Sequence, residues 1–506
     1  MLNIWRKSVE EGTVPDQLKT GLITPLYKGG DKTQPKSYRP ITLTSHLIKI
    51  FERIVCNNIK AYLTKIDAWN ENQHGFRKGR SCLTQLLDHY HRIIDALENE
   101  NSVDVIYLDF CKAFDKVDHE VLLQKLSSIG IRSYALRWIG DFLIGRKQAV
   151  CVDGAISSYV DVGSGVPQGS VVGPLLFLIH IADIDYMLKY SEATSFADDT
   201  RLLMKVRSYE ECAKFQHDLD SVYLWSAQNK MSFNETKFVH LHYSHPKIDA
   251  KMNYRGPRGD TILEEQHCRD LGVEMSTDVI FSQHMDEAVL KANRQCSWIL
   301  RTFSSREPHL MLVLFKQLVL PMLEYCCQLW SPVGLGEIRK IEAVQRSFSN
   351  KMSGMENWCY WSRLKLLNLY SLERRRDRYL ILYTFKIMKG LVPNLAEENL
   401  RIKFEHRGRR GLLCEIPLLN RGAMARYKTL KDRSLAVRGP RLFNCLPSNL
   451  RDMNLSLASF KRKLDTFFVN VPDQPPLLGP EYAQPAKSNS VEDQLEELRR
   501  KGIFFQ

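Results

Sequence analysis

The most informative stretch of the sequence is VDVIYLDFCKAFDKVDH, residues 103–119. Its first eight residues form an apolar run with the length and composition of a buried strand, and Asp109 stands at the end of that run. A second segment, ATSFADDTRLLMKV (193–206), predicts two strands joined at a turn that carries Asp198 and Asp199. Strands and helices alternate around both segments. The sequence therefore predicts an α+β fold with acidic residues at the ends of buried strands.

These three carboxylates have two interpretations. A strand end and the tip of a neighbouring hairpin can bring Asp109, Asp198 and Asp199 to one spot, where carboxylate oxygens bind Mg²⁺. Two such ions carry out in-line phosphoryl transfer. In the simpler interpretation Asp109 caps the next helix and the aspartate pair only makes a turn. The three acids alone leave both open.

Elements on either side extend the pattern. LITPLYK (22–28) predicts a strand, GGDKTQPKSYRP (29–40) a basic loop, and LIKIFERIVCNNIKAYL (47–63) a helix. HEVLLQKLSSIG (119–130) predicts a helix capped by Asp118. Beyond residue 276 helical periodicity replaces strand patterns, so we expect the main boundary there.

Charge and cysteine usage narrow the class of partner. The chain has 71 Lys and Arg against 58 Asp and Glu, a net charge of +13, which favours nucleic acid as a partner. Its twelve cysteines include no C-x-x-C pair, so we expect reduced intracellular thiols and no zinc site. The longest apolar stretch, 310–330, contains Lys316, Pro321 and Glu324, which predicts a buried helix and no membrane span.

Six segments occur in a fixed order along the chain. They are QHGFRKGRSCLTQLL (73–87), YLDFCKAFDKVDH (107–119), SGVPQGSVVGPLLF (164–177), SFADDT (195–200), MSFNETKF (231–238) and DLGV (270–273). This order resembles the motifs of a reverse transcriptase. With PLYKGGDKTQPKSYRPITLTS (25–45), it is most similar to the enzymes of non-long-terminal-repeat (LINE-type) retrotransposons. The resemblance implies a right-hand polymerase with fingers, palm and thumb, which is an RNA-directed DNA polymerase.

The resemblance assigns roles to residues of the acidic segments. Asp109, Asp198 and Asp199 match the metal-binding aspartates, and the backbone carbonyl of Phe110 matches an extra ligand. Phe114 falls where the family has an aromatic gate, whose ring fills the space that a ribose 2′-hydroxyl would need. Without the resemblance, the simpler interpretation of Phe114 is an ordinary core aromatic on the first helical turn. Two Mg²⁺ ions are expected, with Mn²⁺ as a possible substitute.

Other matches concern the nucleotide. Arg39 and Lys28 would neutralise the triphosphate, although a solvated basic loop is the competing interpretation for Lys28. Gln168 and Gly169 would contact the incoming nucleotide, the first through its amide and the second by close backbone approach. Lys237 is a candidate proton donor to pyrophosphate, or else a surface lysine.

Primer and template contacts are expected farther along the chain. Leu271 and Gly272 match the hairpin that positions the primer terminus. Residues 401–440 contain eleven Lys and Arg against three acids, which suits template phosphates or a solvated face. The helical block SLERRRDRYLILYTFKIMKG (371–390) carries four arginines, namely Arg374, Arg375, Arg376 and Arg378. These would also suit template phosphates, although some of them must pack over neighbouring elements.

The predicted organisation has four parts: 1–276 as the reverse transcriptase fingers and palm, 277–400 as a helical thumb-like or connection region, 401–471 as a basic C-terminal region, and 472–506 as a linker and short terminal helix. The predicted function is an RNA-directed DNA polymerase that extends a primer 3′-hydroxyl with dNTPs. Its partners would be an RNA template and a DNA primer or target, with no membrane involved. The alternative is a truncated, catalytically inactive, nucleic-acid-binding relic. Template and target specificity, oligomeric state and the choice between nucleus and cytoplasm stay open.

Overall fold

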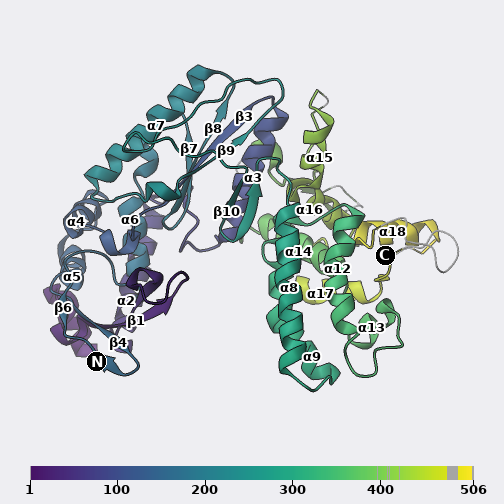
Figure 1. The fold of residues 1–506 in the computed structure, drawn as a ribbon, viewed down its shortest axis with the longest axis horizontal. Coiled ribbons are helices and arrows are strands. Elements are labelled where there is room, and N and C mark those ends of the chain that lie inside the picture. Colours follow the sequence, from purple (N-terminus) through teal and green to yellow (C-terminus); the bar gives the residue numbers. More distant parts are fainter. Residues whose placement is uncertain are drawn as a thin grey trace. The chain divides into compact units, whose positions relative to one another are not determined.

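The structure is a computed structural model that describes residues 2–395, 397–406, 408, 411–420, 422–475 and 488–503. A four-stranded sheet carries the acidic residues, with the strands in the order β7 (Glu192–Phe196), β8 (Asp199–Val206), β3 (Ser102–Leu108) and β9 (Val239–Tyr243). Helix α7 (Tyr209–Gln228) packs along β8 (Figure 1). Six of the seven residues of β3 are buried, so the strand predicted from the apolar run is confirmed.

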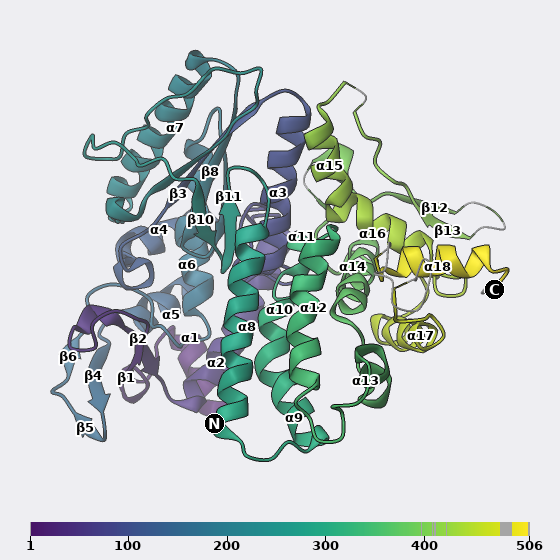
Figure 2. The ribbon, with the colours of Figure 1, turned by 45° about the vertical axis from the view of Figure 1, so that its right-hand side comes forward.

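A second sheet is built from strands β1 (Thr20–Tyr27), β2 (Tyr38–Leu43), β4 (Lys147–Val152), β5 (Ala155–Ile156) and β6 (Val160–Asp161), drawn together in Figure 2. Its order is β2-β1-β4-β5, with β6 also paired to β4. The basic stretch predicted as a loop ends in β2, because Tyr38 pairs with Tyr27 across the hairpin and Pro40 is tolerated on an edge strand.

The N-terminal half of the chain also contains several helices. The N-terminal cap predicted for one of them is confirmed, since the Oδ1 atom of Asp118 accepts a hydrogen bond from the Val121 amide at 3.0 Å. The helices of this half are α1 (Leu2–Glu11), α2 (His46–Lys65), α3 (Cys82–Glu98), α4 (His119–Ser128), α5 (Ser133–Leu143) and α6 (Gly173–Ile181). Strands β10 (His267–Asp270) and β11 (Val273–Ser276) follow as a separate hairpin.

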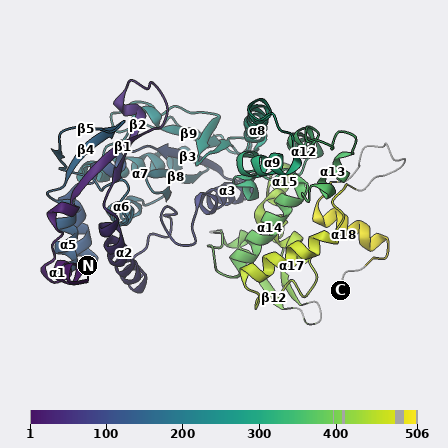
Figure 3. The same cartoon turned by 90° about the horizontal axis from the view of Figure 1, so that it is seen from below.

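The rest of the chain is mostly helical, as predicted. Its helices are α8 (Ser282–Thr302), α9 (Pro308–Leu314), α10 (Leu320–Glu324), α11 (Cys327–Trp330), α12 (Leu335–Ser349), α13 (Tyr360–Leu366), α14 (Leu372–Met388), α15 (Ala425–Arg433), α16 (Leu435–Asn444), α17 (Leu457–Val469) and α18 (Val491–Arg500). Helix α14 packs against α17 (Figure 3) and against α16. One short hairpin interrupts the helices, formed by β12 (Phe404–His406) and β13 (Leu412–Cys414). The α+β fold with a helical C-terminal region is therefore confirmed.

The stretch 310–330, predicted as one buried helix, is divided into several short helical segments in the structure. A π-helical turn over Phe315–Val319 separates α9 from α10, and α11 starts after Cys326, whose φ is 51°. Pro321 explains part of the interruption, because it has no amide hydrogen to donate. Within the described residues, no helix has the length and apolar content needed to cross a membrane.

The chain folds into two compact units. The first contains residues 1–78, 104–240 and 249–264, and the second contains 79–103, 241–248 and 265–506. The units are therefore interleaved in sequence. Helix α3, which precedes the acidic segments in the chain, belongs to the second unit, where its Tyr90 packs against Phe281 from much later in the sequence.

Candidate active site

Asp198 and Asp199 lie on a two-residue turn. Phe196 pairs with Asp199 across the β7–β8 hairpin, so only Ala197 and Asp198 make the reversal. Ala197 has a φ of 56°, in the left-handed region where residues with a side chain are strained. The turn therefore presents two adjacent carboxylates at the end of the sheet, and its tightness depends on contacts that hold Ala197.

Asp109 follows directly after the central strand β3. Its backbone carbonyl accepts a hydrogen bond from the Asn234 amide at 2.7 Å, and the amide of Cys111 donates to the Ser232 carbonyl at 2.8 Å. These bonds fix the segment 231–238 beside the strand end. The Nζ atom of Lys237 lies 3.0 Å from Oδ2 of Asp109. The structure thus brings Lys237 and Asp109 together, as an ion pair.

The three carboxylates interact with one another electrostatically. Burial raises the pKa of Asp198, and repulsion from Asp109 adds to the shift. Desolvation by the surrounding protein atoms raises the pKa of Asp199 to about 6, although the residue is accessible at the surface, and repulsion from Asp198 and Asp109 adds to the shift. The positive charge of Lys237 opposes both shifts, and Arg39 opposes the first. Three like charges that disfavour one another are the donor set that a divalent cation stabilises.

The chemistry of this donor set fits a divalent metal ion. Carboxylate oxygens are hard ligands of the kind that Mg²⁺ prefers. Asp199 is exposed and Asp109 and Asp198 are partly exposed, so their oxygens are accessible to an ion and to a substrate phosphate. Asp109, Asp198 and Asp199 are the residues that would hold it.

Phe114 lies near this site in sequence and is fixed by other aromatic rings. Its ring stacks on Phe177 at 4.3 Å with an angle of 15°, and the edge of Phe76 approaches it at 6.1 Å. Phe114 is only partly buried, whereas Phe177 is fully buried. One face of the Phe114 ring is therefore supported by the core, and the residue is not an interior core aromatic. Its role as a gate stays a prediction.

Gln168 and Gly169 already have partners within the protein. The Gln168 side-chain amide donates to Oδ1 of Asp115 at 2.8 Å, and its backbone carbonyl accepts from the Thr42 amide at 2.6 Å. Gly169 has a φ of 123°, and a Cβ there would stand 2.4 Å from the Thr42 carbonyl oxygen. The close approach that requires glycine is thus to strand β2. Contact of either residue with a nucleotide remains a prediction.

Lys28 and Arg39 lie on the hairpin of β1 and β2. Both side chains are exposed, and the Lys28 amide donates to the Ser37 carbonyl at 2.9 Å. Arg39 acts electrostatically on Asp198, whereas the solvated-loop interpretation of Lys28 stays open. Phe110 is buried, and its ring stacks on Phe233 at 4.5 Å.

Leu271 and Gly272 form the turn between β10 and β11, in the second compact unit. Both have positive φ, of 44° and 86°, so the turn is tight. The Tyr325 hydroxyl donates to the Leu271 carbonyl at 2.8 Å, and a Cβ on Gly272 would meet the Tyr325 ring at 3.3 Å. The expected hairpin is present, and its action on a primer is a prediction.

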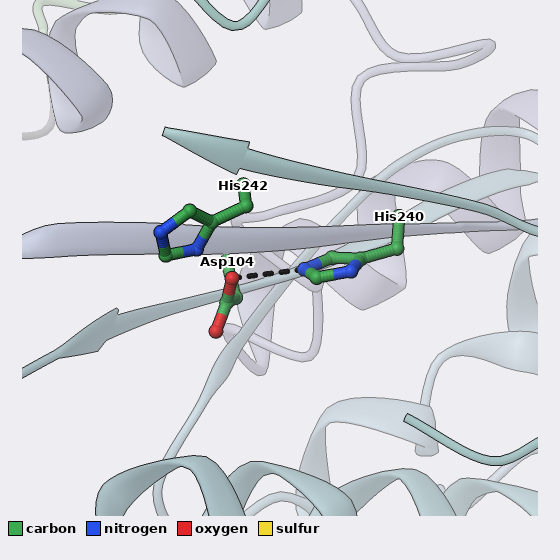
Figure 4. A group of neighbouring side chains, drawn as sticks. All are labelled: Asp104, His240 and His242. Carbon is green, nitrogen blue, oxygen red and sulfur yellow. Dashed lines mark hydrogen bonds and ion pairs between the residues drawn. The ribbon is translucent and has the colours of Figure 1, made fainter. Parts of the chain in front are cut away.

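A buried polar network lies in the same sheet as the aspartates. Figure 4 shows Asp104 on β3 with His240 and His242 on β9. The Nε2 atom of His240 lies 2.8 Å from Oδ1 of Asp104, and the Tyr254 hydroxyl donates to the other carboxylate oxygen at 2.5 Å. Both oxygens of Asp104 are therefore engaged by protein groups, which indicates a structural role.

The matching family model is described as reverse transcriptase (RNA-dependent DNA polymerase), and it covers residues 28–275. All three aspartates lie inside that range. The chain contains a reverse transcriptase domain. The predicted resemblance to the non-long-terminal-repeat type is confirmed as well, since the curated relatives come from such elements.

Two curated relatives illustrate the sequence similarity of this chain to polymerases of mobile elements. The probable RNA-directed DNA polymerase from transposon X-element of Drosophila melanogaster is 27% identical over 69% of this chain and 38% of its own length. The polymerase from mobile element jockey of Drosophila funebris is 28% identical over 69% of this chain and 39% of its own length. The chain thus spans about two fifths of these relatives.

Solved structures that are similar to this chain include apo telomerase from Candida tropicalis. The TM-score is 0.43, and the sequence identity is 10% over 77% of this chain and 70% of the telomerase chain. Telomerase from Candida albicans with a fragment of telomeric RNA has a TM-score of 0.38 and 11% identity over 76% and 61% of the two chains.

Sequence patterns missed several residues that shape the reverse transcriptase domain. Gln73 and Gly75 contact the turn at Ala197, and Phe177 supports Phe114. All three lie inside the quoted motifs. No cue in composition or periodicity singles them out, because the contact of each is with a residue distant in the chain.

The arginines of helix α14 contact neighbouring elements of the protein. Arg374 donates to the Pro472 carbonyl at 2.6 Å, and Arg376 is buried. Arg375 makes a bidentate ion pair with Glu324, and Arg378 makes one with Asp465. The expectation that some of these arginines pack over neighbouring elements is therefore confirmed, and phosphate contact by this helix stays a prediction.

Part of the basic region 401–440 also pairs internally. Lys431 makes a buried ion pair with Glu98, and Arg438 lies 3.3 Å from Asp377. Arg426 is exposed and donates to the Asp278 carbonyl at 2.9 Å. Four further arginines on which the phosphate interpretation depended lie outside the described residues, namely Arg407, Arg409, Arg410 and Arg421.

Proposed function

We propose that this chain is the polymerase part of an RNA-directed DNA polymerase from a non-long-terminal-repeat retrotransposon. It extends a primer 3′-hydroxyl with dNTPs on an RNA template. The observation that carries the proposal is the placement of Asp109 directly after β3 and of Asp198 and Asp199 on the β7–β8 turn, inside the matched domain and near enough to repel one another. A bound cation relieves the repulsion within such a group. An intracellular site of action accords with the twelve cysteines, none of which forms a disulfide within the described residues.

The carboxylates hold two Mg²⁺ ions, or Mn²⁺ in their place. When bound, such ions lower the pKa of the attacking hydroxyl and stabilise charge on the leaving oxygen. The residues of the chain position the reactants. Asp109 is fixed by the Asn234 amide, and Asp198 and Asp199 are fixed by the β7–β8 turn. Asp199 must be deprotonated to serve as a ligand.

Cationic side chains complete the site. Lys237, 3.0 Å from Asp109, neutralises part of the negative charge before substrate arrives and then donates a proton to the pyrophosphate. Arg39, already in the electrostatic field of Asp198, binds the triphosphate and compensates charge that develops on the leaving group. Gln168, Gly169 and Lys28 bind the nucleotide, and Leu271 and Gly272 position the primer.

The second candidate is an inactive nucleic-acid-binding relic of the same element. The observation that favours it is the internal pairing of the α14 arginines, which leaves template binding to other surfaces. Primer extension by the purified chain on an RNA template distinguishes the two, with dNTPs or rNTPs and with Mg²⁺, Mn²⁺ or chelator. The polymerase extends with dNTPs and a divalent ion, and the relic binds RNA without extending.

The matched test of the site is Asp198→Asn. We expect it to abolish extension and to leave RNA binding within about threefold, because it removes a charge that holds metal while phosphate contacts persist. Asp153→Asn is the control, since Asp153 is an exposed turn residue that carries the same charge. Equal loss of binding and extension in Asp198→Asn, with extension retained in the control, would indicate a folding defect and leave the site without support.

A further inference from the structure

The turn that carries Asp198 is held in a conformation that it would not adopt alone. Ala197 has a φ of 56°, although alanine has no local hydrogen-bonding group that favours this region, as asparagine or aspartate would. A two-residue hairpin turn needs positive φ, and glycine is the usual residue there. Something in the surroundings must therefore compensate for the strain at Ala197.

The side-chain amide of Gln73 forms hydrogen bonds with both backbone polar groups of Ala197. The Ala197 amide donates to Oε1 of Gln73 at 2.8 Å, and Nε2 of Gln73 donates to the Ala197 carbonyl at 3.3 Å. Oε1 also accepts from the Gly75 amide at 2.8 Å, which fixes the orientation of the side chain. Gln73 is only 4% exposed, so water does not compete for these bonds.

The backbone around Gln73 reinforces the contact. The His74 amide donates to the Ser195 carbonyl at 2.8 Å, and the Ser195 amide donates to the Asn72 carbonyl at 3.0 Å. A Cβ on Gly75 would stand 2.3 Å from the Ala197 nitrogen. Glycine at this position is what lets the segment approach the turn so closely.

We propose that Gln73 is a positioning residue, which holds Ala197 in its left-handed conformation and thereby aims the Asp198 carboxylate at the metal. This inference rests on the proposed function. It predicts that loss of the amide lets Ala197 relax to negative φ and rotates the adjacent aspartate away from Asp109. A residue that only filled space in the core would not have this effect.

The test uses Gln73→Met in the full chain, because methionine preserves the volume and removes the three hydrogen bonds. Three measurements are made: amide hydrogen exchange of the peptide that covers 196–199, Mn²⁺ affinity without nucleotide, and primer extension. We expect exchange at least about tenfold faster, Mn²⁺ affinity about tenfold weaker, and RNA binding unchanged. Gln124→Ala, an exposed glutamine on α4, is the control and should alter none of these.

A second substitution distinguishes positioning from general packing. Glycine adopts positive φ without strain, so Ala197→Gly combined with Gln73→Met should restore Mn²⁺ affinity to within about threefold of wild type, while the exchange stays fast. Restoration would not follow if Gln73 merely supported the fold. Mn²⁺ affinity that stays low in the double variant overturns the proposal, and so does unchanged affinity in Gln73→Met alone.

If Gln73→Met does not fold, Gly75→Ala tests the same contact with Gln73 in place, because the added Cβ must displace the turn. It should weaken Mn²⁺ affinity, and affinity equal to wild type overturns the proposal. Failure of the proposed function gives a different result. A wild-type chain that never extends a primer refutes the polymerase, whereas exchange and Mn²⁺ binding still report on the contact between Gln73 and the turn.

Discussion

Single residues in this site depend on neighbours that their own type does not reveal. Phe114 is an example. Its ring is partly exposed on one side and stacked at 4.3 Å on the fully buried Phe177 on the other. A ring that is backed by a packed core cannot retreat without opening a cavity. The stack therefore gives Phe114 the rigidity that a steric gate against a 2′-hydroxyl requires.

Phe114→Val should lower the preference for dNTPs over rNTPs by about tenfold or more, because the shorter side chain leaves space for the 2′-hydroxyl. Total activity should also fall, since a cavity forms beside Phe177. The measurement is the ratio of kcat/KM for dNTP to that for rNTP. Phe142→Val is the control, because Phe142 is fully buried in α5 and stacks on Trp138 instead. A variant that extends primers with an unchanged ratio returns Phe114 to a packing role.

Helices of the second compact unit are joined by a buried ion pair, although charged residues of this kind are usually expected at the surface. The last residue of α3, Glu98, lies 2.5 Å from Lys431 on α15, and both are nearly fully buried. Glu98 also accepts from the Asn420 amide at 2.8 Å. Breaking such a pair leaves a buried charge without a counterion, which costs more than the pair contributes.

Lys431→Met should lower the free energy of unfolding by about 3–5 kcal/mol, because Glu98 is left buried and unneutralised. Adding Glu98→Gln should recover most of the loss, since glutamine is neutral and still accepts from Asn420. Urea unfolding measures both. Lys403→Met is the control. Lys403 forms an exposed ion pair with Glu398 at 3.8 Å, so this substitution should change the free energy of unfolding by less than about 1 kcal/mol. Equal losses in the single and double variants would contradict the explanation.

Helix α14 contains a carboxyl group that makes stability depend on pH. Burial raises the pKa of Glu373 to about 7, and repulsion from Asp377 adds to the shift while Arg376 opposes it. The folded state therefore binds a proton more readily than the unfolded state. The free energy of unfolding is therefore highest, as far as Glu373 is concerned, below pH 4.5. It decreases as the pH rises from 4.5 towards 7, because the buried carboxyl group must then lose its proton.

Glu373→Gln should be more stable than wild type at pH 8 by roughly 2 kcal/mol, and this advantage should shrink as the pH falls to about 5. Glutamine can still accept the hydrogen bond that the Asn489 amide donates to Glu373 at 2.9 Å. Urea unfolding at both pH values measures the difference. The exposed residue Glu356 provides the control Glu356→Gln. A difference that does not change with pH would contradict the raised pKa.

For the molecule as a whole, net charge and its distribution govern the interaction with nucleic acid. The chain carries +13, and residues 401–440 contribute eleven basic against three acidic residues. Because Lys431 and Arg438 pair internally, they are poor candidates for phosphate contacts. Arg407, Arg409, Arg410 and Arg421 remain as candidates by charge alone.

Replacing these four arginines by glutamine should weaken RNA binding uniformly across template sequences, because phosphate contacts carry no sequence information. The slope of log K against log salt should fall by up to about 3, at roughly 0.7 per lost contact on a single strand. Filter binding at several salt concentrations measures this. The control replaces an equal number of exposed lysines of the first unit, Lys7, Lys65, Lys147 and Lys189. An unchanged slope would mean that the four arginines are only solvated.

Local patterns in the sequence determined the secondary structure and the chemistry of the site. The Asp118 cap depends on a contact within a few residues, and composition and spacing mark the apolar run at 103–110 and the position of the turn at 196–199, so these features can be predicted from the sequence. The motif order identified the family, and with it the three aspartates. The metal-binding role of these residues stays a prediction, which the Asp198→Asn variant tests.

Only the tertiary structure decided which polar groups are available and which are occupied. Arg375 and Arg378 look free in sequence but pair with Glu324 and Asp465. Gln73 and Ala197 are 124 positions apart and share two hydrogen bonds. Such contacts depend on how distant segments pack, and no period or propensity encodes them. The same reason explains the two interleaved units, in which helix α3 joins elements far along the chain.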